Sequence, residues 1–285
     1  MSTTAAATAA TPVPEVWVPR YEHAGRVTQA RILLSEWTKL HSLRSTRWSF
    51  LAATVLGIGL SCIFAAVTAS HWSSMSLHDR LDRHPLDIAL AGVNVAQLAV
   101  AVLGVLVITG EYSTGMIRAS LTAVPKRLPV LWAKSAVFAA VTFVLMLPTV
   151  LIAFFGSQAI LRNHHILQIS FTAPGVARSV IGGAGYLVLV GVLALAIGAI
   201  LRNTAGGIAL FVFLLFVLPG ITAILPSSVA DSISPYLPLN AGTTVASVTF
   251  DNSHHLSSWG GFAVFAGYAA LAVILAAVGL RRRDA

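Results

Sequence analysis

Two pairs of adjacent histidines are the side chains best suited to metal chemistry in this chain. They are His164–His165 and His254–His255, and Cys62 is the single cysteine. Zinc is normally held by four well-placed ligands, and adjacent side chains point in different directions, so neither pair forms a chelating site by itself. A disulfide or a cysteine-based zinc site needs more cysteines. We expect solvated loop histidines and no metal site, with joint metal capture by both pairs as the minor alternative.

Sequence motifs of the common hydrolase and nucleotide sites are absent. The chain has no HExxH, no GxSxG and no GxxxxGK[ST] sequence. Without the last of these, no loop of backbone N–H groups and a lysine is available to hold phosphates. We therefore expect that the chain is not an enzyme, binds no cofactor, and relies on a separate polypeptide for any use of ATP.

The stretch GEYSTGMIRASLTAVPKR gathers polar and basic residues in an otherwise apolar chain. Glu111 stands near its start, Gly115 permits a sharp turn, and Pro125 ends the short helix that follows. Ile117 and Leu121 are four residues apart, on one face of that helix. A helix this short is marginal in water, so we expect it to dock against lipid headgroups or a groove on another protein.

The overall composition indicates that this stretch belongs to a membrane protein. Charged residues make up 10% of the 285 residues, and hydrophobic residues make up 56%. Soluble domains carry about 25% charged residues. The net charge of +8 is divided among loops and is not gathered on one soluble face, which argues against a nucleic-acid partner.

Six charge-poor windows are long enough to cross a bilayer as helices, which needs about 20 apolar residues each. The sequence therefore predicts an all-α integral membrane protein. A further charge-free stretch, 232–250, contains prolines and hydroxyl residues and fits a loop or re-entrant segment better. The six predicted spans are about 49–70, 88–109, 133–156, 180–201, 206–225 and 260–280.

The distribution of lysine and arginine predicts the orientation of these spans. With an internal amino terminus, the inner segments carry fourteen of these residues, and the outer loops carry only Arg80, Arg83, Arg162 and Arg178. Cytoplasmic loops carry the excess of basic residues in membrane proteins. We therefore expect both termini in the cytoplasm, with residues 1–25 as a disordered tail of Ala, Thr and Pro.

Residues 26–47 form an amphipathic pattern directly before the first span. Such a helix lies flat in the membrane interface, and we interpret it chiefly as a membrane anchor, the alternative being an elbow that also braces a partner. Its polar side includes Glu36 and Lys39. Apolar residues recur at three- and four-residue steps on the other side: Val27, Ala30, Leu33, Leu34, Trp37 and Leu40.

Polar and proline residues within the spans suggest packing contacts or hinges. Asn94 and Gln97 lie one turn apart in the second span, so both can face the interior of the bundle, as helix–helix hydrogen-bonding groups or, less favoured, as part of a solute path. Pro148 and Pro219 predict kinks in the third and fifth spans. Such kinks serve either packing or hinge motion.

In these features the chain resembles the permease subunit of ABC-2-type exporters, over nearly all of residues 26–283. Those permeases have six spans, an amphipathic helix before the first, and a cytoplasmic coupling helix between spans two and three. Their loop has a glutamate, then a glycine and an apolar stretch closed by proline, positions that Glu111, Gly115, Leu121 and Pro125 fill here. At Met116 the chain departs from the threonine that many members have.

The resemblance implies a six-span permease domain over 48–283 that dimerises with a second permease copy or paralogue in a bacterial plasma membrane. It implies a partner ABC ATPase that binds ATP and drives export through the coupling helix, and short re-entrant helices in the last external loop. Membrane lipids are the other expected partner. The alternative is a membrane protein without an ATPase, a secondary transporter or a scaffold. Against ion coupling, the six windows hold no ionisable residue at mid-bilayer depth.

Overall fold

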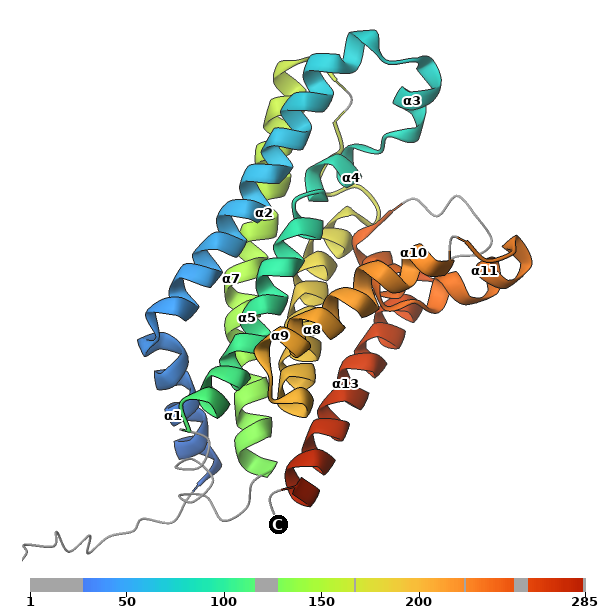
Figure 1. Ribbon diagram of the computed structural model, residues 1–285. Helices are drawn as coiled ribbons and strands as arrows, with labels where there is room; N and C mark the ends of the chain where they lie inside the picture. Colours follow the sequence, from blue (N-terminus) through green and yellow to red (C-terminus); the bar gives the residue numbers. More distant parts are fainter. Residues whose placement is uncertain (1–27, 116–127, 167, 223, 249–255, 284–285) are drawn as a thin grey trace, which may run out of the picture.

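The computed structural model describes residues 28–115, 128–166, 168–222, 224–248 and 256–283, and these contain helices and no strand (Figure 1). The longer helices stand side by side as a bundle, and several short helices lie at its upper end and beside it in Figure 1. The helices of the first half are α1 (Gln29–Ser42), α2 (Arg44–His71), η1 (Trp72–Ser74), α3 (Leu77–Asp82), α4 (Pro85–Leu90), α5 (Val93–Ser113) and α7 (Leu128–Asn163). Those of the second half are α8 (Val176–Leu201), α9 (Thr204–Val212), η2 (Phe213–Val217), α10 (Leu218–Thr222), α11 (Ser227–Ile233), η3 (Ser234–Tyr236), α12 (Pro238–Thr243), η4 (Thr244–Ala246) and α13 (Ser258–Arg283).

Six of the described segments are long and apolar enough to cross a membrane, which confirms the predicted number of spans. The helices extend beyond most of the predicted limits, and the fifth is shorter, because Ile224 and Leu225 lie in a turn before Pro226. The six segments are Arg44–Ser74, Pro85–Ser113, Leu128–Asn163, Val176–Leu201, Thr204–Thr222 and Ser258–Arg282.

Helix α8 lies at the centre of the bundle and is the most buried of the six segments. It packs against α5, α7 and α13, while α2 covers the other side of α5 and α7. Small residues bring α5 and α8 close together. A Cβ atom placed on Gly104 would lie only 2.4 Å from the backbone oxygen of Gly191. The two helices therefore meet with their backbones nearly in contact, as small residues allow in membrane helices.

The helix geometry differs between the two prolines that were expected to bend their helices. Helix α7 stays helical on both sides of Pro148. Before Pro219, in contrast, the fifth segment changes to the π-helical turn η2, in which the Leu218 N–H bonds to the Phe213 oxygen. Proline has no N–H and its ring crowds the preceding turn, so an irregularity here was expected, although its π form was not. The hinge role of both prolines stays a prediction.

The stretch predicted as a loop or re-entrant segment, 232–250, is described as far as residue 248 and forms short helices. Of these, α12 and η4 pack against α8 and α13. Ala241 and Val245 are fully buried there, and Gly242 lies against the ring of Tyr186. The re-entrant placement that the family resemblance implies for this region stays a prediction.

Candidate functional site

Helix α1 lies beside the lower parts of α2 and α7 (Figure 1). Its buried residues are Ile32, Glu36 and Leu40, each four residues after the last. Leu34 and Trp37, from the predicted apolar side, are 65% and 51% exposed. Of the predicted polar side, Glu36 is buried, and Leu40 of the predicted apolar side is buried with it. The Glu36 carboxylate is buried because two lysines meet it there.

Four charged side chains form an ionic cluster where α1 meets the end of α5 and the start of α7. The Lys134 ammonium donates to Glu36 Oε2 at 2.5 Å and to Glu111 Oε1 at 2.8 Å. The Lys39 Nζ lies 2.7 Å from Glu36 Oε1 and 3.2 Å from Glu111 Oε1. Each lysine thus contacts both carboxylates. We call these four residues the ionic cluster.

The ionic cluster is almost closed to solvent and balanced in charge. The side chains of Glu36 and Lys134 are 2% and 3% exposed, and that of Glu111 is 9% exposed. Lys39, at 25%, forms the edge toward solvent. Buried charges are tolerated only when they are paired and hydrogen-bonded. The two positive and two negative groups meet that condition, except that Glu111 Oε2 has no hydrogen-bond partner in the structure.

The surroundings of Lys39 affect its ionisation. Burial lowers the pKa of its ammonium group, but the hydrogen bond to Glu36 and the nearby charges of Glu111 and Glu36 raise it by more, so its pKa lies above the ordinary lysine value. A raised lysine pKa contributes stability that is fully present at neutral pH and is lost only as the pH rises through the raised value. Lys39 therefore stays charged under all physiological conditions.

Helices α5 and α7 present their members of the cluster close to the segment between them. Glu111 lies in the last turn of α5, and Lys134 lies in the second turn of α7. After α5 the backbone turns sharply at Gly115, whose φ is +72°. This left-handed conformation is open to glycine at no steric cost, as predicted for this position.

A further contact joins α8 to the end of α5, next to the ionic cluster. Arg202 follows the last residue of α8 in a left-handed conformation, with φ +54°. Its guanidinium lies 5.1 Å from the centre of the Tyr112 ring, in a cation–π arrangement. Because Tyr112 follows Glu111 directly, the end of α5 is held from two sides, by α8 and by the ionic cluster.

Of the predicted coupling residues, the structure describes Glu111 and Gly115. Glu111 is a member of the ionic cluster, a contact that the sequence did not suggest. Ile117, Leu121 and Pro125, and with them the predicted coupling helix, lie outside the described residues.

The predicted polar pair of the second span is divided between two environments. Gln97 is buried, and its Oε1 atom accepts a hydrogen bond from the Tyr186 hydroxyl of α8. Its Nε2 atom donates to the Asn94 backbone oxygen at 2.8 Å. The Asn94 side chain is exposed and lines a cavity of about 200 Å³ together with Asp87 and Thr243. Gln97 thus joins α5 to α8, while Asn94 faces open space.

Only one of the two histidine pairs lies within the described residues. His164 and His165 are exposed just after the end of α7, and His254 and His255 lie outside the described residues. Within the described residues, no group of three or more His, Cys, Asp or Glu side chains is arranged to hold a metal ion.

Three members of the ionic cluster were missed as site residues: Glu36, Lys39 and Lys134. One signal was present in the sequence. Glu36 and Glu111 are the only acidic residues in the segments 26–47 and 110–134, which are otherwise basic. Two isolated carboxylates among basic residues at one membrane surface are candidates for a shared ion-pair network.

Comparison with known proteins adds no assignment. No protein-family model matches the chain, and no curated protein is significantly similar to it.

Proposed function

We propose that this chain is the membrane-spanning permease subunit of an ATP-driven exporter of the ABC-2 type. In this proposal both termini face the cytoplasm of a bacterial cell. A separate ABC ATPase binds and hydrolyses ATP, and a second permease copy or paralogue completes the dimer. The cargo is an amphiphilic or hydrophobic solute, such as a drug, peptide or lipid-like molecule, because the spans carry few charges that would favour an ion.

The observation that carries this proposal is the position of the ionic cluster. It joins Glu36 of α1 to Glu111 and Lys134, which lie on the two sides of residues 116–127. A force applied to that segment would reach α5 and α7 through the chain itself. It would reach α1 through the buried ion pairs. This is the connection expected of a transporter that receives mechanical work from a partner at one end of its bundle.

In the proposed cycle, closure of the ATPases on ATP moves residues 116–127 and tilts α5, α7 and α1 together. Packed helices shift as rigid bodies when an interface between them has two stable arrangements. A buried ionic cluster favours such joint motion, because separating its charges in a low-dielectric setting costs several kcal/mol. The α5–α7 pair would thereby alternate the access of the cargo between the two sides of the membrane.

Co-purification with a candidate ABC ATPase, sought first among the products of neighbouring genes, tests the proposal. We expect Leu121→Asp to abolish both co-purification and cargo-stimulated ATP hydrolysis, because a charge replaces an apolar docking side chain. The matched control is Leu77→Asp. Leu77 is 72% exposed on α3, away from the α1 end of the bundle, so this variant should retain both properties. Membrane insertion is checked for both variants by protease protection.

Two results would contradict the proposal. One is that Leu121→Asp and Leu77→Asp both co-purify with the ATPase as well as the parent protein does. The other is transport by vesicles that contain this chain and no ATPase, which would instead favour a stand-alone secondary transporter.

A further inference from the structure

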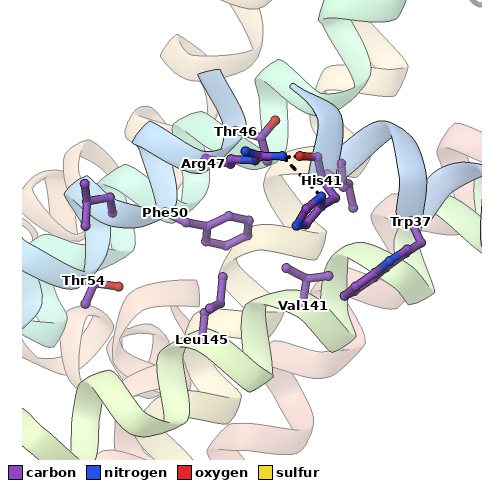
Figure 2. Close-up of a pocket in the computed structure, with 10 residues that line it drawn as sticks. Trp37, His41, Thr46, Arg47, Phe50, Thr54, Val141 and Leu145 are labelled. Carbon is purple, nitrogen blue, oxygen red and sulfur yellow. Dashed lines mark hydrogen bonds between the residues drawn. The ribbon is translucent and has the colours of Figure 1, made fainter. Parts of the chain in front are cut away.

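A cleft of about 320 Å³ lies between α1, α2 and α7, close to the ionic cluster but separate from it (Figure 2). Small-molecule sites in proteins typically have volumes of about 300–1,000 Å³, so the cleft is large enough to hold part of a ligand. Its lining comes from α1 and α2, which follow each other in the chain, and from α7, which comes later. The lining residues are Trp37, Leu40, His41, Thr46, Arg47, Phe50, Leu51, Thr54, Val141 and Leu145.

One side of the cleft is cationic and carries open hydrogen-bond donors. The Arg47 Nε donates to the His41 backbone oxygen at 2.7 Å, and its Nη2 atom lies 3.3 Å from His41 Nδ1 (Figure 2). A guanidinium has five N–H donors, so these two contacts leave others for a ligand. In the described parts of the chain, no Asp or Glu forms an ion pair with Arg47. An anion would complete this side of the cleft.

The remaining wall of the cleft is apolar. The Phe50 ring points between α2 and α7, and Val141 and Leu145 line the α7 side in the same view (Figure 2). These groups offer dispersion contacts and no hydrogen bonds, which suits a hydrocarbon chain. Burying hydrocarbon releases about 0.8 kcal/mol for each CH₂ group. The cleft therefore combines an anion-binding edge with a hydrocarbon-binding wall.

Its position along the chain places this combination at a membrane surface. Arg47 lies in the first turn of α2, where the first membrane-spanning segment begins. Trp37 and Trp48, which flank it in sequence, are 51% and 69% exposed. Exposed tryptophans are typical of the headgroup layer. The cationic edge is therefore at headgroup level, and Phe50 and Leu145 extend toward the acyl chains.

We propose that this cleft binds an anionic phospholipid, with its phosphate at Arg47 and one acyl chain between Phe50, Val141 and Leu145. A phospholipid fits better than a peptide, because a single chemistry, an anion attached to a hydrocarbon tail, matches both sides of the cleft. The bound lipid would fill the wedge between α1 and the bundle. This site is independent of any ATPase, so its test and that of the proposed function can fail separately.

Native mass spectrometry of the full chain, purified in mild detergent, measures the binding directly. The probes are dioleoyl phosphatidylglycerol, dioleoyl phosphatidylcholine and inorganic phosphate. We expect retention of phosphatidylglycerol over phosphatidylcholine, and little effect of free phosphate on this retention. Arg47→Gln should lower phosphatidylglycerol retention roughly fivefold, the usual contribution of one basic residue near an anionic surface. Arg47→Lys should restore most of it.

Two matched controls separate the cleft from the general surface of the protein. Arg44→Gln removes the same charge from an exposed position of α2 that does not line the cleft, and it should leave retention within about twofold of the parent protein. Leu145→Trp fills the cleft and should abolish retention. Val144→Trp introduces the same side chain at a position 66% exposed and outside the cleft, and it should not abolish retention.

Three outcomes would overturn the proposal. Equal losses for Arg44→Gln and Arg47→Gln would show that only the surface charge matters. Unchanged retention in Leu145→Trp would show that no acyl chain enters the cleft. Displacement of phosphatidylglycerol by an equal concentration of inorganic phosphate would show that the site recognises a free anion and not a lipid.

Discussion

Replacing Lys134 with methionine is expected to destabilise the protein strongly, because it leaves two buried carboxylates facing each other. The Lys134 ammonium lies 2.5 Å and 2.8 Å from oxygens of Glu36 and Glu111. Removing one partner of a buried ion pair costs about 3–5 kcal/mol. Lys39 remains within 3.2 Å of both carboxylates, so we expect a value near the lower end. About 3 kcal/mol corresponds to a change on the order of a hundredfold in the unfolding equilibrium.

The double variant Glu36→Gln/Lys134→Met tests whether charge balance is the cause. It leaves Glu111 with Lys39, one negative and one positive group. We expect it to be more stable than Lys134→Met alone by at least about 1.5 kcal/mol, within the range of coupling energies for residues in contact. The control is Arg281→Met, which removes an exposed positive charge near the end of α13 and should change stability by less than about 0.5 kcal/mol.

The assay is equilibrium unfolding of the purified full chain in mixed micelles by a denaturing detergent, followed by tryptophan fluorescence. Two results would refute the reasoning: Lys134→Met as stable as Arg281→Met, or a double variant no more stable than Lys134→Met. A second readout concerns the proposed function. If the cluster transmits motion from the partner, Lys134→Met should retain ATPase binding at low temperature while losing most transport.

Two further predictions concern the packing of α5 on α8. Gly104→Ala places a methyl group against the Gly191 oxygen and should destabilise the protein by about 1–3 kcal/mol. Gly110→Ala, with open space around its position, should be neutral or slightly stabilising. Equal effects of the two substitutions on unfolding in detergent would show that the close approach of α5 and α8 is unimportant. Tyr186→Phe removes the hydroxyl that donates to Gln97 and should lower the free energy of unfolding by about 0.6 kcal/mol, the average for such bonds between membrane helices. If neither Tyr186→Phe nor Gln97→Leu changes the stability beyond experimental error, this hydrogen bond does not stabilise the bundle.

The number and approximate limits of the spans could be predicted because they depend on local composition. A bilayer requires about 20 consecutive apolar residues, and charged residues mark where each span must end. Single residues with strong backbone preferences were also predictable. The turn at Gly115 followed from the freedom of glycine. Proline was a weaker guide, because the helix is irregular before Pro219 but continuous through Pro148.

Which charges pair in the ionic cluster could not be predicted, because its members are far apart in the sequence, although Glu36 and Glu111 stand out as single carboxylates in basic segments. Glu36 is 98 residues from Lys134, and nothing in the local pattern distinguishes a charge that faces solvent from one that faces another helix. The pattern in 26–47 predicted an apolar side that includes Trp37 and Leu40, and of these two only Leu40 is buried, together with Ile32 and Glu36. Which side is buried depends on the neighbours, and a single helix does not reveal them.

The ionic cluster also has a consequence for how the chain is made. The ribosome delivers residues 36 and 111 to the membrane before residue 134, so for an interval both carboxylates of the ionic cluster are present with only one of its two lysines, Lys39. They must stay hydrated during that interval, and α1 lacks the ion pair with Lys134 that joins it to α7. Arrival of the third span supplies the missing ammonium group. The order of synthesis thus makes insertion of α7 the event that fixes α1 in place.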